Sequence, residues 1–352
     1  MKPEIAIVGG GLAGLSLAYH LHRADVDFQL FEARDRFGGR IKTLIDGEAG
    51  FDLGPSWFWP GQPRMAELVQ HLGLRRFDQY SAGQICFEDE VGRVHRGMGF
   101  ASMEGSWRIA GGVSALINAL VAKLPHARLH LASAVCGVSR DGAVTLQNGK
   151  HITARQIVLA IPPRVAATLT YAPDLSTDQM RALQGIPTWM GSHAKFVATY
   201  DRPFWREMGL SGDGIRRHGP LAEIHDASGP DGTSPALFGF LGVPAQHRQG
   251  QGDAIKSAAL DQLVRFFGPE AASPRKTAFQ DWATEPETAT DLDLKPLHGH
   301  PDYGLPGVLG DVWDGILRFG STEVARDFGG FLEGALAVAE DLANGIVRET
   351  RG

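Results

Sequence analysis

The apolar and polar positions of the first forty residues follow the order strand, glycine turn, helix, strand, glycine turn. Residues 5–8 form a short apolar run, as expected of a strand buried on both faces in a parallel sheet. Apolar residues recur at helical spacing after the first glycines, and a second apolar run ends at Glu32. This order predicts a parallel βαβ unit at the start of the chain.

Three glycines at GxGxxG spacing, Gly9, Gly11 and Gly14, connect the first predicted strand to the helix. The first permits a tight turn, the second lets backbone approach a pyrophosphate, and the third lets helix and strand pack closely. The helix N-terminus offers unpaired N–H groups to phosphates. Glu32 can accept a hydrogen bond from a ribose hydroxyl, which disfavours a 2′-phosphate. The pattern therefore predicts a dinucleotide site.

A second glycine turn follows Glu32 and favours the same ligand. Gly38 and Gly39 leave the backbone bare, and the Arg40 guanidinium can form bidentate, charge-assisted hydrogen bonds with a phosphate. We therefore expect both glycine turns to meet one pyrophosphate.

Strand patterns continue in the middle of the chain. Residues 128–163 are predicted to form a meander of strands, with turns at Asp141-Gly142 and Asn148-Gly149 that supply positive φ. Residues 193–200 alternate as a strand on which His193, Lys195 and Val197 share one face. A lysine on such a strand either reaches out at a sheet edge or has a chemical role.

The C-terminal region predicts a helix that opens at Phe328-Gly329-Gly330. Its apolar positions Leu332, Leu336 and Ala339 fall on one face. The N-terminus of this helix would stabilise a nearby negative charge.

These motifs resemble a known family. The stretches GGGLAGL (9–15) and FEARDRFGGR (31–40) look like the double motif that holds FAD in the flavin-containing amine oxidases, the relatives of monoamine oxidase. Further segments resemble the family in the right order: DLGPSW (52–57), VLAIPP (158–163), GSHAKFVATYDRPFWR (191–206), DWATE (281–285) and FGSTEVARDFGGFLEGA (319–335). Desaturases and other flavoproteins share the first and last segments of this list. The segment around Lys195 is much more specific to amine oxidases.

The resemblance implies an FAD site and a role for each matched residue. Lys195 would hold a water molecule against flavin N5, where burial would lower its pKa. Val135 would meet the adenine through its backbone, and Glu323 would accept from a ribityl hydroxyl. The residues implied to bind FAD are Gly9, Gly11, Gly14, Glu32, Arg34, Gly38, Gly39, Arg40, Val135, Glu323 and Leu332.

The implied substrate pocket departs from the family pattern. Trp57, Trp282 and Phe331 match positions that line the flavin or the substrate cavity. Phe331 and Leu292 stand where monoamine oxidases have the two tyrosines of an aromatic cage, so the cage is incomplete or another aromatic completes it. Asp291 stands where mammalian relatives carry the cysteine that bonds the flavin. We therefore predict non-covalent FAD.

The fold class implied is α/β, with a discontinuous, Rossmann-like FAD-binding domain and a second, mixed-sheet substrate domain. The FAD-binding domain is assigned residues 1–75, 108–185 and 284–352. The substrate domain is assigned residues 76–107 and 186–283. Its first segment is short where long-chain relatives have a helical insertion, so the chain resembles a trimmed version of the family.

Composition excludes several other classes of protein. The 352 residues are 43% hydrophobic and 21% charged, as in a globular protein with two sizeable cores. A net charge of −6 without long basic clusters argues against nucleic-acid binding. Two cysteines form no CxxC and no disulfide framework, the histidines form no HExxH, and no metal site is expected.

The sequence contains no signal-peptide pattern and no run of about 18 apolar residues. We therefore expect a soluble, cytoplasmic enzyme without a membrane partner, unlike family members with a C-terminal membrane helix. The oligomeric state cannot be read from the sequence.

The leading hypothesis is oxidation of a small-molecule amine by hydride transfer to flavin N5, imine hydrolysis and reoxidation by O2 to give H2O2. Two alternatives stay open at this point. One is a desaturase-like or porphyrinogen-oxidase-like flavoprotein acting on a non-amine C–H, and the other is a catalytically silent FAD-binding module. Further aromatic residues mildly favour an apolar or aromatic amine: Trp59, Trp189, Phe238 and Phe240.

Overall fold

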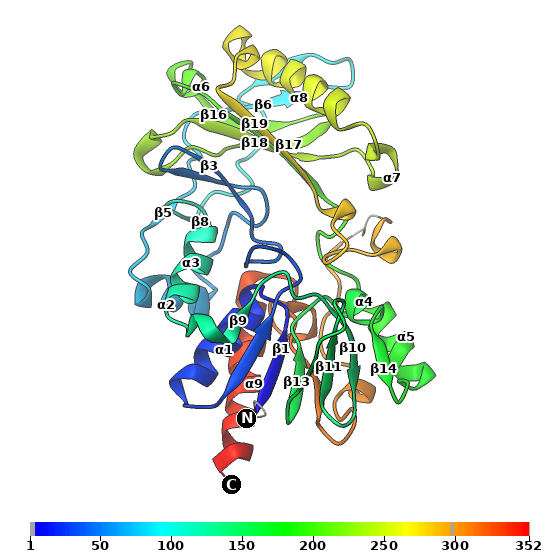
Figure 1. Cartoon of the computed structure of the whole chain (residues 1–352). Coiled ribbons are helices and arrows are strands. Elements are labelled where there is room, and N and C mark those ends of the chain that lie inside the picture. Colours follow the sequence, from blue (N-terminus) through cyan, green and yellow to red (C-terminus); the bar gives the residue numbers. More distant parts are fainter. Residues whose placement is uncertain (1–3, 296, 298, 352) are drawn as a thin grey trace.

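The computed structural model describes residues 4–295, 297 and 299–351. A parallel sheet with its helices forms one half, and a large mixed sheet forms the other (Figure 1). The mixture of helices with parallel and antiparallel sheets confirms the predicted fold class.

A five-stranded parallel sheet forms the centre of the first half. Its strands, in spatial order, are β20 (Leu317–Phe319), β13 (Gln156–Leu159), β1 (Ile5–Val8), β2 (Phe28–Phe31) and β9 (Leu129–His130). β1 pairs in parallel with both β2 and β13, and all four of its residues are buried. The predicted βαβ unit is therefore formed, with β1 inside the sheet.

Alternate residues of β1 enter two different cores, because successive side chains of a strand point to opposite faces. Ile5 and Ile7 belong to the core beneath the helices. Ala6 and Val8 belong to the core shared with a second, smaller sheet. The parallel sheet is therefore the middle layer of three.

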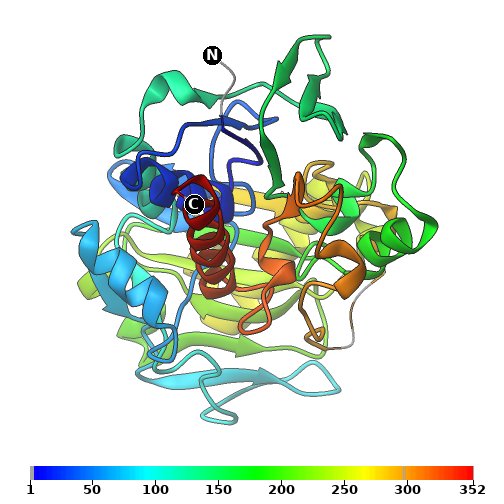
Figure 2. The same cartoon turned by 90° about the horizontal axis from the view of Figure 1, so that it is seen from below.

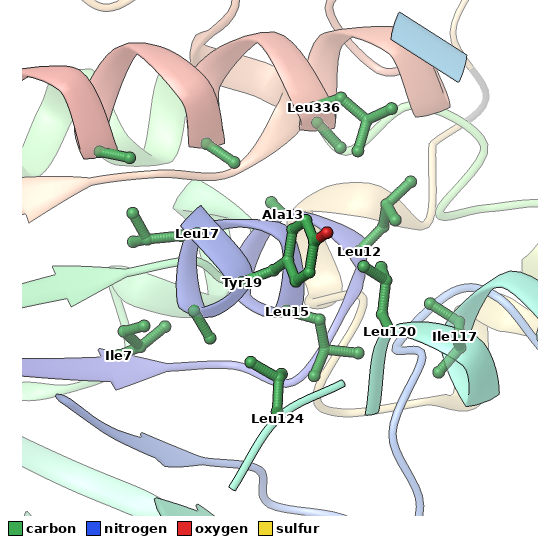
Figure 3. Close-up of a cluster of buried hydrophobic side chains, with 14 of the residues drawn as sticks. Ile7, Leu12, Ala13, Leu15, Leu17, Tyr19, Ile117, Leu120, Leu124 and Leu336 are labelled. Atoms are coloured by element: carbon green, nitrogen blue, oxygen red, sulfur yellow. The ribbon is translucent and has the colours of Figure 1, made fainter. Parts of the chain in front are cut away.

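Helices cover the first of these faces, and helix α1 packs along the C-terminal helix α9. Figure 3 shows Leu12, Leu15 and Leu17 of α1 in a cluster with Leu336 of α9 and with residues of α3. In the view from below, α9 is foreshortened, with its C-terminal end toward the viewer, and lies beside α1 (Figure 2). The helices of this layer are α1 (Leu12–Arg23), α2 (Pro63–His71), α3 (Ser114–Ala122) and α9 (Leu332–Arg351).

A four-stranded sheet covers the other face. Its strands are β12 (His151–Thr153), β11 (Ala143–Leu146), β10 (Val135–Ser139) and β14 (Thr170–Ala172). The predicted turns at residues 141–142 and 148–149 join the antiparallel strands β10, β11 and β12, and both turn glycines have positive φ. This part of the meander prediction is confirmed.

A seven-stranded sheet forms the second half, and all its neighbours are antiparallel except β16 and β6. Its strands, in spatial order, are β19 (Lys276–Asp281), β15 (Ala194–Thr199), β18 (Ala236–Leu241), β17 (Leu221–Asp226), β16 (Leu210–Ile215), β6 (Gln84–Glu88) and β7 (Val94–Arg96). Helix α8 (Gly252–Phe267) covers one face with Ile255, Ala259, Leu263 and Phe266, which recur at helical spacing.

The remaining elements are short. Two strand pairs are β3 (Thr43–Asp46) with β4 (Ala49–Asp52), and β5 (Arg76–Asp78) with β8 (Trp107–Ile109). The other α-helices are α4 (Pro163–Ala166), α5 (Thr177–Gly185), α6 (Phe204–Glu207) and α7 (Ala245–Arg248). Single 3₁₀ turns lie at His126–Arg128, Pro230–Gly232, Pro269–Ala272, Trp282–Thr284, Asp291–Asp293, Gly307–Leu309 and Thr322–Val324.

All strands of the seven-stranded sheet come from the two segments assigned to a substrate domain. The β3–β4 hairpin comes from the first FAD-binding segment, yet Phe51 and Leu53 pack with Val197 and Phe238 of that sheet. The hairpin therefore belongs by packing to the second half. The division of the chain into two domains otherwise stays a prediction.

Candidate active site

A cavity of about 470 Å³ is lined by residues of both halves. One end contains the turn between β1 and α1, and the other contains β15 and several aromatic side chains. Most of the predicted site residues line it: Gly9, Gly11, Glu32, Arg34, Gly38, Gly39, Arg40, Trp57, Val135, Lys195, Trp282, Phe331 and Leu332. Gly14, Leu292 and Glu323 are not among the lining residues.

The glycine turn brings the backbone to the cavity wall. Gly9 has a φ of +109°, and a Cβ on it would lie 2.6 Å from the Ala160 carbonyl oxygen. A Cβ on Gly14 would lie 2.0 Å from the Gly9 carbonyl oxygen, so Gly14 serves the close packing of helix against turn. Helix α1 begins at Leu12 with no acidic residue in its first turn, which leaves its N–H groups available to an anion.

Glu32 holds the two nucleotide loops together. Its Oε2 accepts from the Gly10 N–H at 2.7 Å, and its Oε1 accepts from the Arg34 N–H at 3.0 Å. A carboxylate has about four acceptor positions, so Glu32 keeps capacity for a ribose hydroxyl. The Gly38 N–H donates to the Gly10 carbonyl at 2.8 Å, which brings the two glycine turns side by side as expected.

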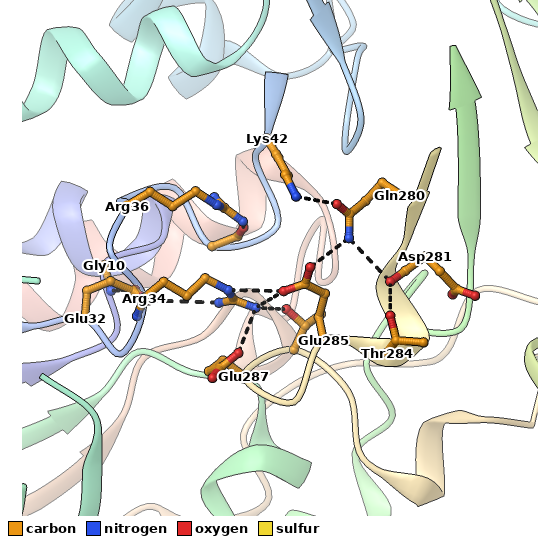
Figure 4. A network of polar contacts seen from close by, with 12 residues as sticks. Gly10, Glu32, Arg34, Arg36, Lys42, Gln280, Asp281, Thr284, Glu285 and Glu287 are labelled. Carbon is orange, nitrogen blue, oxygen red and sulfur yellow. Dashed lines mark hydrogen bonds and ion pairs between the residues drawn. The ribbon is translucent and has the colours of Figure 1, made fainter. Parts of the chain in front are cut away.

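Arg34 connects this end of the cavity to the end of β19 through a polar network (Figure 4). Its guanidinium donates to Glu285 Oε2 at 3.1 Å and lies 3.4 Å from Glu287 Oε2. Gln280 accepts from Lys42 Nζ at 2.6 Å and donates to Glu285 Oε1 at 2.9 Å. The network joins the two halves of the protein at the nucleotide end.

Glu323 is completely buried behind Arg40. Its Oε1 accepts from Arg40 Nη1 at 2.5 Å, while no described residue bonds its Oε2. The structure therefore places Glu323 where it orients Arg40, and its bond to a ribityl hydroxyl stays a prediction.

The C-terminal helix begins at Leu332, so the expected opening at residues 328–330 is wrong. Phe328 and Gly330 have φ of +54° and +81°, which is the left-handed region and incompatible with a right-handed helix. These residues form a turn that aims the start of α9 at the cavity, which Gly330, Phe331 and Leu332 line.

Lys195 lies on β15 with 2% of its surface exposed, so it does not reach out at a sheet edge. Its Nζ donates to Ser56 Oγ at 2.6 Å and to the Gly54 carbonyl at 3.2 Å. It lies 3.8 Å from the ring centroid of Phe238, a cation–π distance. Burial lowers the pKa of Lys195 to about 7, although the Asp52 carboxylate opposes this shift.

Aromatic side chains form the walls near Lys195. Trp57 donates from Nε1 to Gln79 Oε1 at 2.8 Å, and Trp282 donates from Nε1 to the Leu53 carbonyl at 3.0 Å. Both indoles are therefore fixed in orientation while their rings line the cavity.

A row of aromatic side chains lies near Phe331, where the sequence predicted an incomplete aromatic cage. The Phe331 ring is stacked on His300 at 5.0 Å and meets Trp59 edge-to-face at 6.4 Å. Trp189 continues the row, 4.8 Å from His300. Leu292, assigned to the substrate pocket, is 50% exposed on a 3₁₀ turn away from the cavity, so that assignment is wrong.

Among the lining residues that were not predicted as site residues are Ser56 and His193. The signal for His193 was present, since the strand pattern put it on the same face as Lys195. Ser56 lies in the DLGPSW segment, but its contact with Lys195 joins positions 139 residues apart and no local pattern reveals it.

The lining residues fit FAD. Glycines without Cβ atoms, the free N–H groups of α1, Glu32 and Arg40 would hold the ribose and pyrophosphate, and Val135 lies at the same end of the cavity. The start of α9 and Lys195 would meet the flavin ring. No group of three or more His, Cys, Asp or Glu within the described ranges could hold a metal ion.

Fold and site together define a flavin-dependent oxidoreductase. A family profile described as flavin containing amine oxidoreductase matches residues 12–99 and 95–347, and the chain belongs to this family. The chain is therefore an amine oxidoreductase with FAD as its cofactor.

Relatives span nearly the whole chain at low identity. A probable flavin-containing monoamine oxidase A of Dictyostelium discoideum is 24% identical over 95% of each chain. A putrescine oxidase of Kocuria rosea is 23% identical over 98% of this chain and 96% of the relative. Among solved structures, cyclohexylamine oxidase of Brevibacterium oxydans superposes with a TM-score of 0.83, 21% identity and complete coverage of both chains.

The alignment with the Dictyostelium protein spans 442 positions, more than the 352 residues of this chain. The relative therefore carries segments that this chain lacks. The two profile matches overlap at residues 95–99, around the end of β7, where the implied insertion of long-chain relatives would fall. Across the part of the chain that the structure describes, no helix is long and apolar enough to cross a membrane.

Proposed function

We propose that this chain oxidises an apolar or aromatic monoamine at the carbon next to nitrogen. FAD, when bound, takes a hydride at N5, and O2 then takes the two electrons to give hydrogen peroxide. The imine product hydrolyses in water. The observation that carries this proposal is Lys195, which is buried, bonded to Ser56 and placed at the aromatic end of a flavin-type cavity.

The charges of the cavity support a monoamine. Glu32 and Glu287 are the acidic lining residues of the described chain, and each lies within 4 Å of the Arg34 guanidinium at the nucleotide end. None of the described residues that line the Lys195 end has a carboxylate to pair a second ammonium group. Burying an unpaired charge is costly, so a diamine such as putrescine should bind poorly.

The protein's own contribution would be positioning and electrostatics. Trp57, Trp282 and the ring row that contains Phe331 would confine the apolar part of the amine. Lys195, held by Ser56 and the Gly54 carbonyl, would keep a water molecule at a fixed place beside the flavin ring.

Anaerobic mixing of the FAD-loaded protein with benzylamine, cyclohexylamine or putrescine tests the proposal. Loss of the flavin absorbance with the two monoamines, and weak or no loss with putrescine, is expected. Lys195→Met should slow flavin reduction or reoxidation by more than about tenfold, whereas Lys123→Met, at an exposed position directly after α3, should not.

The same experiment separates the alternatives. A flavin that no amine bleaches, but that a non-amine substrate does, would indicate a desaturase-like or porphyrinogen-oxidase-like enzyme. A stable FAD complex that no reducing substrate bleaches would indicate a silent binding module.

A further inference from the structure

His193 is a polar cavity residue to which the proposed reaction gives no task. It lies directly before β15 and two positions from Lys195, so both side chains point to the same side, and both line the cavity. Its ring centroid is 6.4 Å from that of Trp189, another lining residue. A molecule at the Lys195 end of the cavity therefore lies beside His193.

The backbone that carries this ring is fixed. The His193 carbonyl accepts from the Trp282 N–H at 3.0 Å. Arg248 donates from Nη2 to the carbonyl of Ser192 at 2.7 Å, and it forms a buried two-point ion pair with Asp281. His193 therefore keeps one position in the cavity wall, as a side chain that selects between ligands must.

The ring is not used by the protein's own hydrogen bonds. Its Nδ1 is buried and bonds to no described residue. Its Nε2 also has no hydrogen-bond partner in the described ranges, and it is not among the buried unpartnered atoms, so it is the nitrogen that a molecule in the cavity can reach. Most buried polar atoms in native proteins have a partner, and exceptions concentrate where a ligand, water or reaction supplies one.

The ring is neutral at neutral pH and above. Burial lowers the pKa of His193 below its ordinary value of 6.5, and the Arg248 guanidinium lowers it further. In a neutral imidazole, Nε2 is the hydrogen-bond donor in one tautomer and the acceptor in the other. A hydroxyl group both donates and accepts, so it can pair with Nε2 in either tautomer. A neutral polar group is thus a better partner for this ring than a second charged group.

Lys195 and Ser56 line the same end of the cavity, and their polar atoms bond to each other. Lys195 Nζ also donates to the Gly54 carbonyl. The free nitrogen of His193 differs from these groups, because a wholly apolar amine that displaced water from it would leave it unpaired. A site with such a group discriminates against an analogue that lacks the matching hydroxyl.

We propose that His193 is a specificity-determining residue that binds a hydroxyl group of the amine substrate through Nε2. The inference rests on the proposed function and narrows its substrate class to aromatic monoamines that carry a hydroxyl group. The hydroxyl would replace water at Nε2, while the amine nitrogen and the carbon next to it meet the flavin ring.

Anaerobic reduction of the FAD-loaded protein by matched amines at pH 7.5 tests the proposal. Benzylamine is compared with 3-hydroxybenzylamine and 4-hydroxybenzylamine, and phenethylamine with tyramine and 2-amino-1-phenylethanol. The limiting rate of flavin reduction divided by the dissociation constant should be at least about tenfold higher for one hydroxylated amine than for its parent.

Variants identify the group that recognises the hydroxyl. His193→Phe keeps a flat ring and removes both nitrogens, and His193→Leu is a second variant without them, so in each the preference should fall below about threefold. His300→Phe is the matched control and should keep the preference. His300 belongs to the row of aromatic side chains near Phe331, but its Nε2 is already bonded to the Gly329 carbonyl at 2.8 Å. Because each preference is a ratio within one variant, a change in that variant's overall activity cancels.

The outcomes are separable. A wild-type protein that prefers no hydroxylated amine over its parent by tenfold overturns the inference, whether or not the variants fold. A preference that persists without the His193 nitrogens, or that His300→Phe also loses, overturns the role of Nε2. Failure of every amine to bleach wild-type FAD rejects the proposed function and this inference with it. Bleaching by parent and hydroxylated amines with equal efficiency rejects this inference alone.

Discussion

Lys195 is an ionisable group held where burial opposes its charge. The sequence pattern placed Lys195 and His193 on the same face of a strand, and the segment around Lys195 resembled that of amine oxidases. Its partner Ser56 was not, because the contact depends on the packing of the β3–β4 region beneath the seven-stranded sheet. Residue patterns thus singled out Lys195, while its environment could be described only from the fold.

The environment of Lys195 predicts a pH-dependent stability. A base whose pKa is about 7 in the folded chain and about 10.5 in the unfolded chain is protonated only in the unfolded state between these values. Stability should therefore rise from pH 7 to pH 10.5, and the full penalty should be present below pH 7. Lys195→Met removes this penalty. The unfolding free energy of the variant minus that of wild type should therefore be larger at pH 7 than at pH 10, by on the order of 1–3 kcal/mol.

Urea unfolding of FAD-loaded wild type and Lys195→Met at both pH values measures this difference. Lys123→Met, which changes an exposed lysine, serves as the control and should show no such trend. An equal difference between wild type and Lys195→Met at pH 7 and pH 10 would mean that Lys195 keeps its ordinary pKa.

At the scale of elements, the first βαβ unit was the most predictable part of the fold. Its strands and glycine turn follow from apolar runs and from positions where a side chain has no room. The start of α9 was missed because a run of small and aromatic residues does not reveal that Phe328 takes a left-handed conformation. Leu292 was misplaced for a related reason, since a matched position gives no side-chain direction on an irregular turn.

Gly14 should be the position in this unit where an added methyl group is least tolerated. Its Cβ would meet the Gly9 carbonyl oxygen at 2.0 Å, and backbone cannot rotate away as a side chain can. Gly14→Ala should therefore lower the unfolding free energy by about 1–3 kcal/mol and weaken FAD binding, because the turn that meets the pyrophosphate must move. Thermal unfolding and FAD titration measure the two effects.

Gly345 in α9 is a matched control. A Cβ there would lie 3.5 Å from the Arg318 guanidinium, an ordinary contact, and the residue is inside a regular helix. Gly345→Ala should raise stability by about 0.5–1 kcal/mol, since glycine costs that much in a helix interior. Similar losses in both variants would show that the close approach at Gly14 has no special cost.

At the scale of the whole molecule, the sheets combine segments that are far apart in the sequence. β1 lies between β2 and β13, and β20 from the C-terminal region completes one edge. Apolar patterns predict such strands but not their neighbours, so the spatial order and the cavity between the halves came only from the structure. The contact of Arg34 with Glu285, which lies 251 positions further along the chain, is a further feature without a local signal.

The placement of the cysteines makes covalent attachment of FAD through a thioether unfavourable. Neither Cys86 nor Cys136 lines the cavity. Burial raises the pKa of Cys86 to about 11, so its thiolate, the nucleophilic form, is scarce at neutral pH. Acid precipitation should therefore leave a colourless pellet and release the FAD to the supernatant, and the intact denatured chain should have the mass of the polypeptide alone. Yellow pelleted protein, or added mass equal to one FAD, would contradict non-covalent binding.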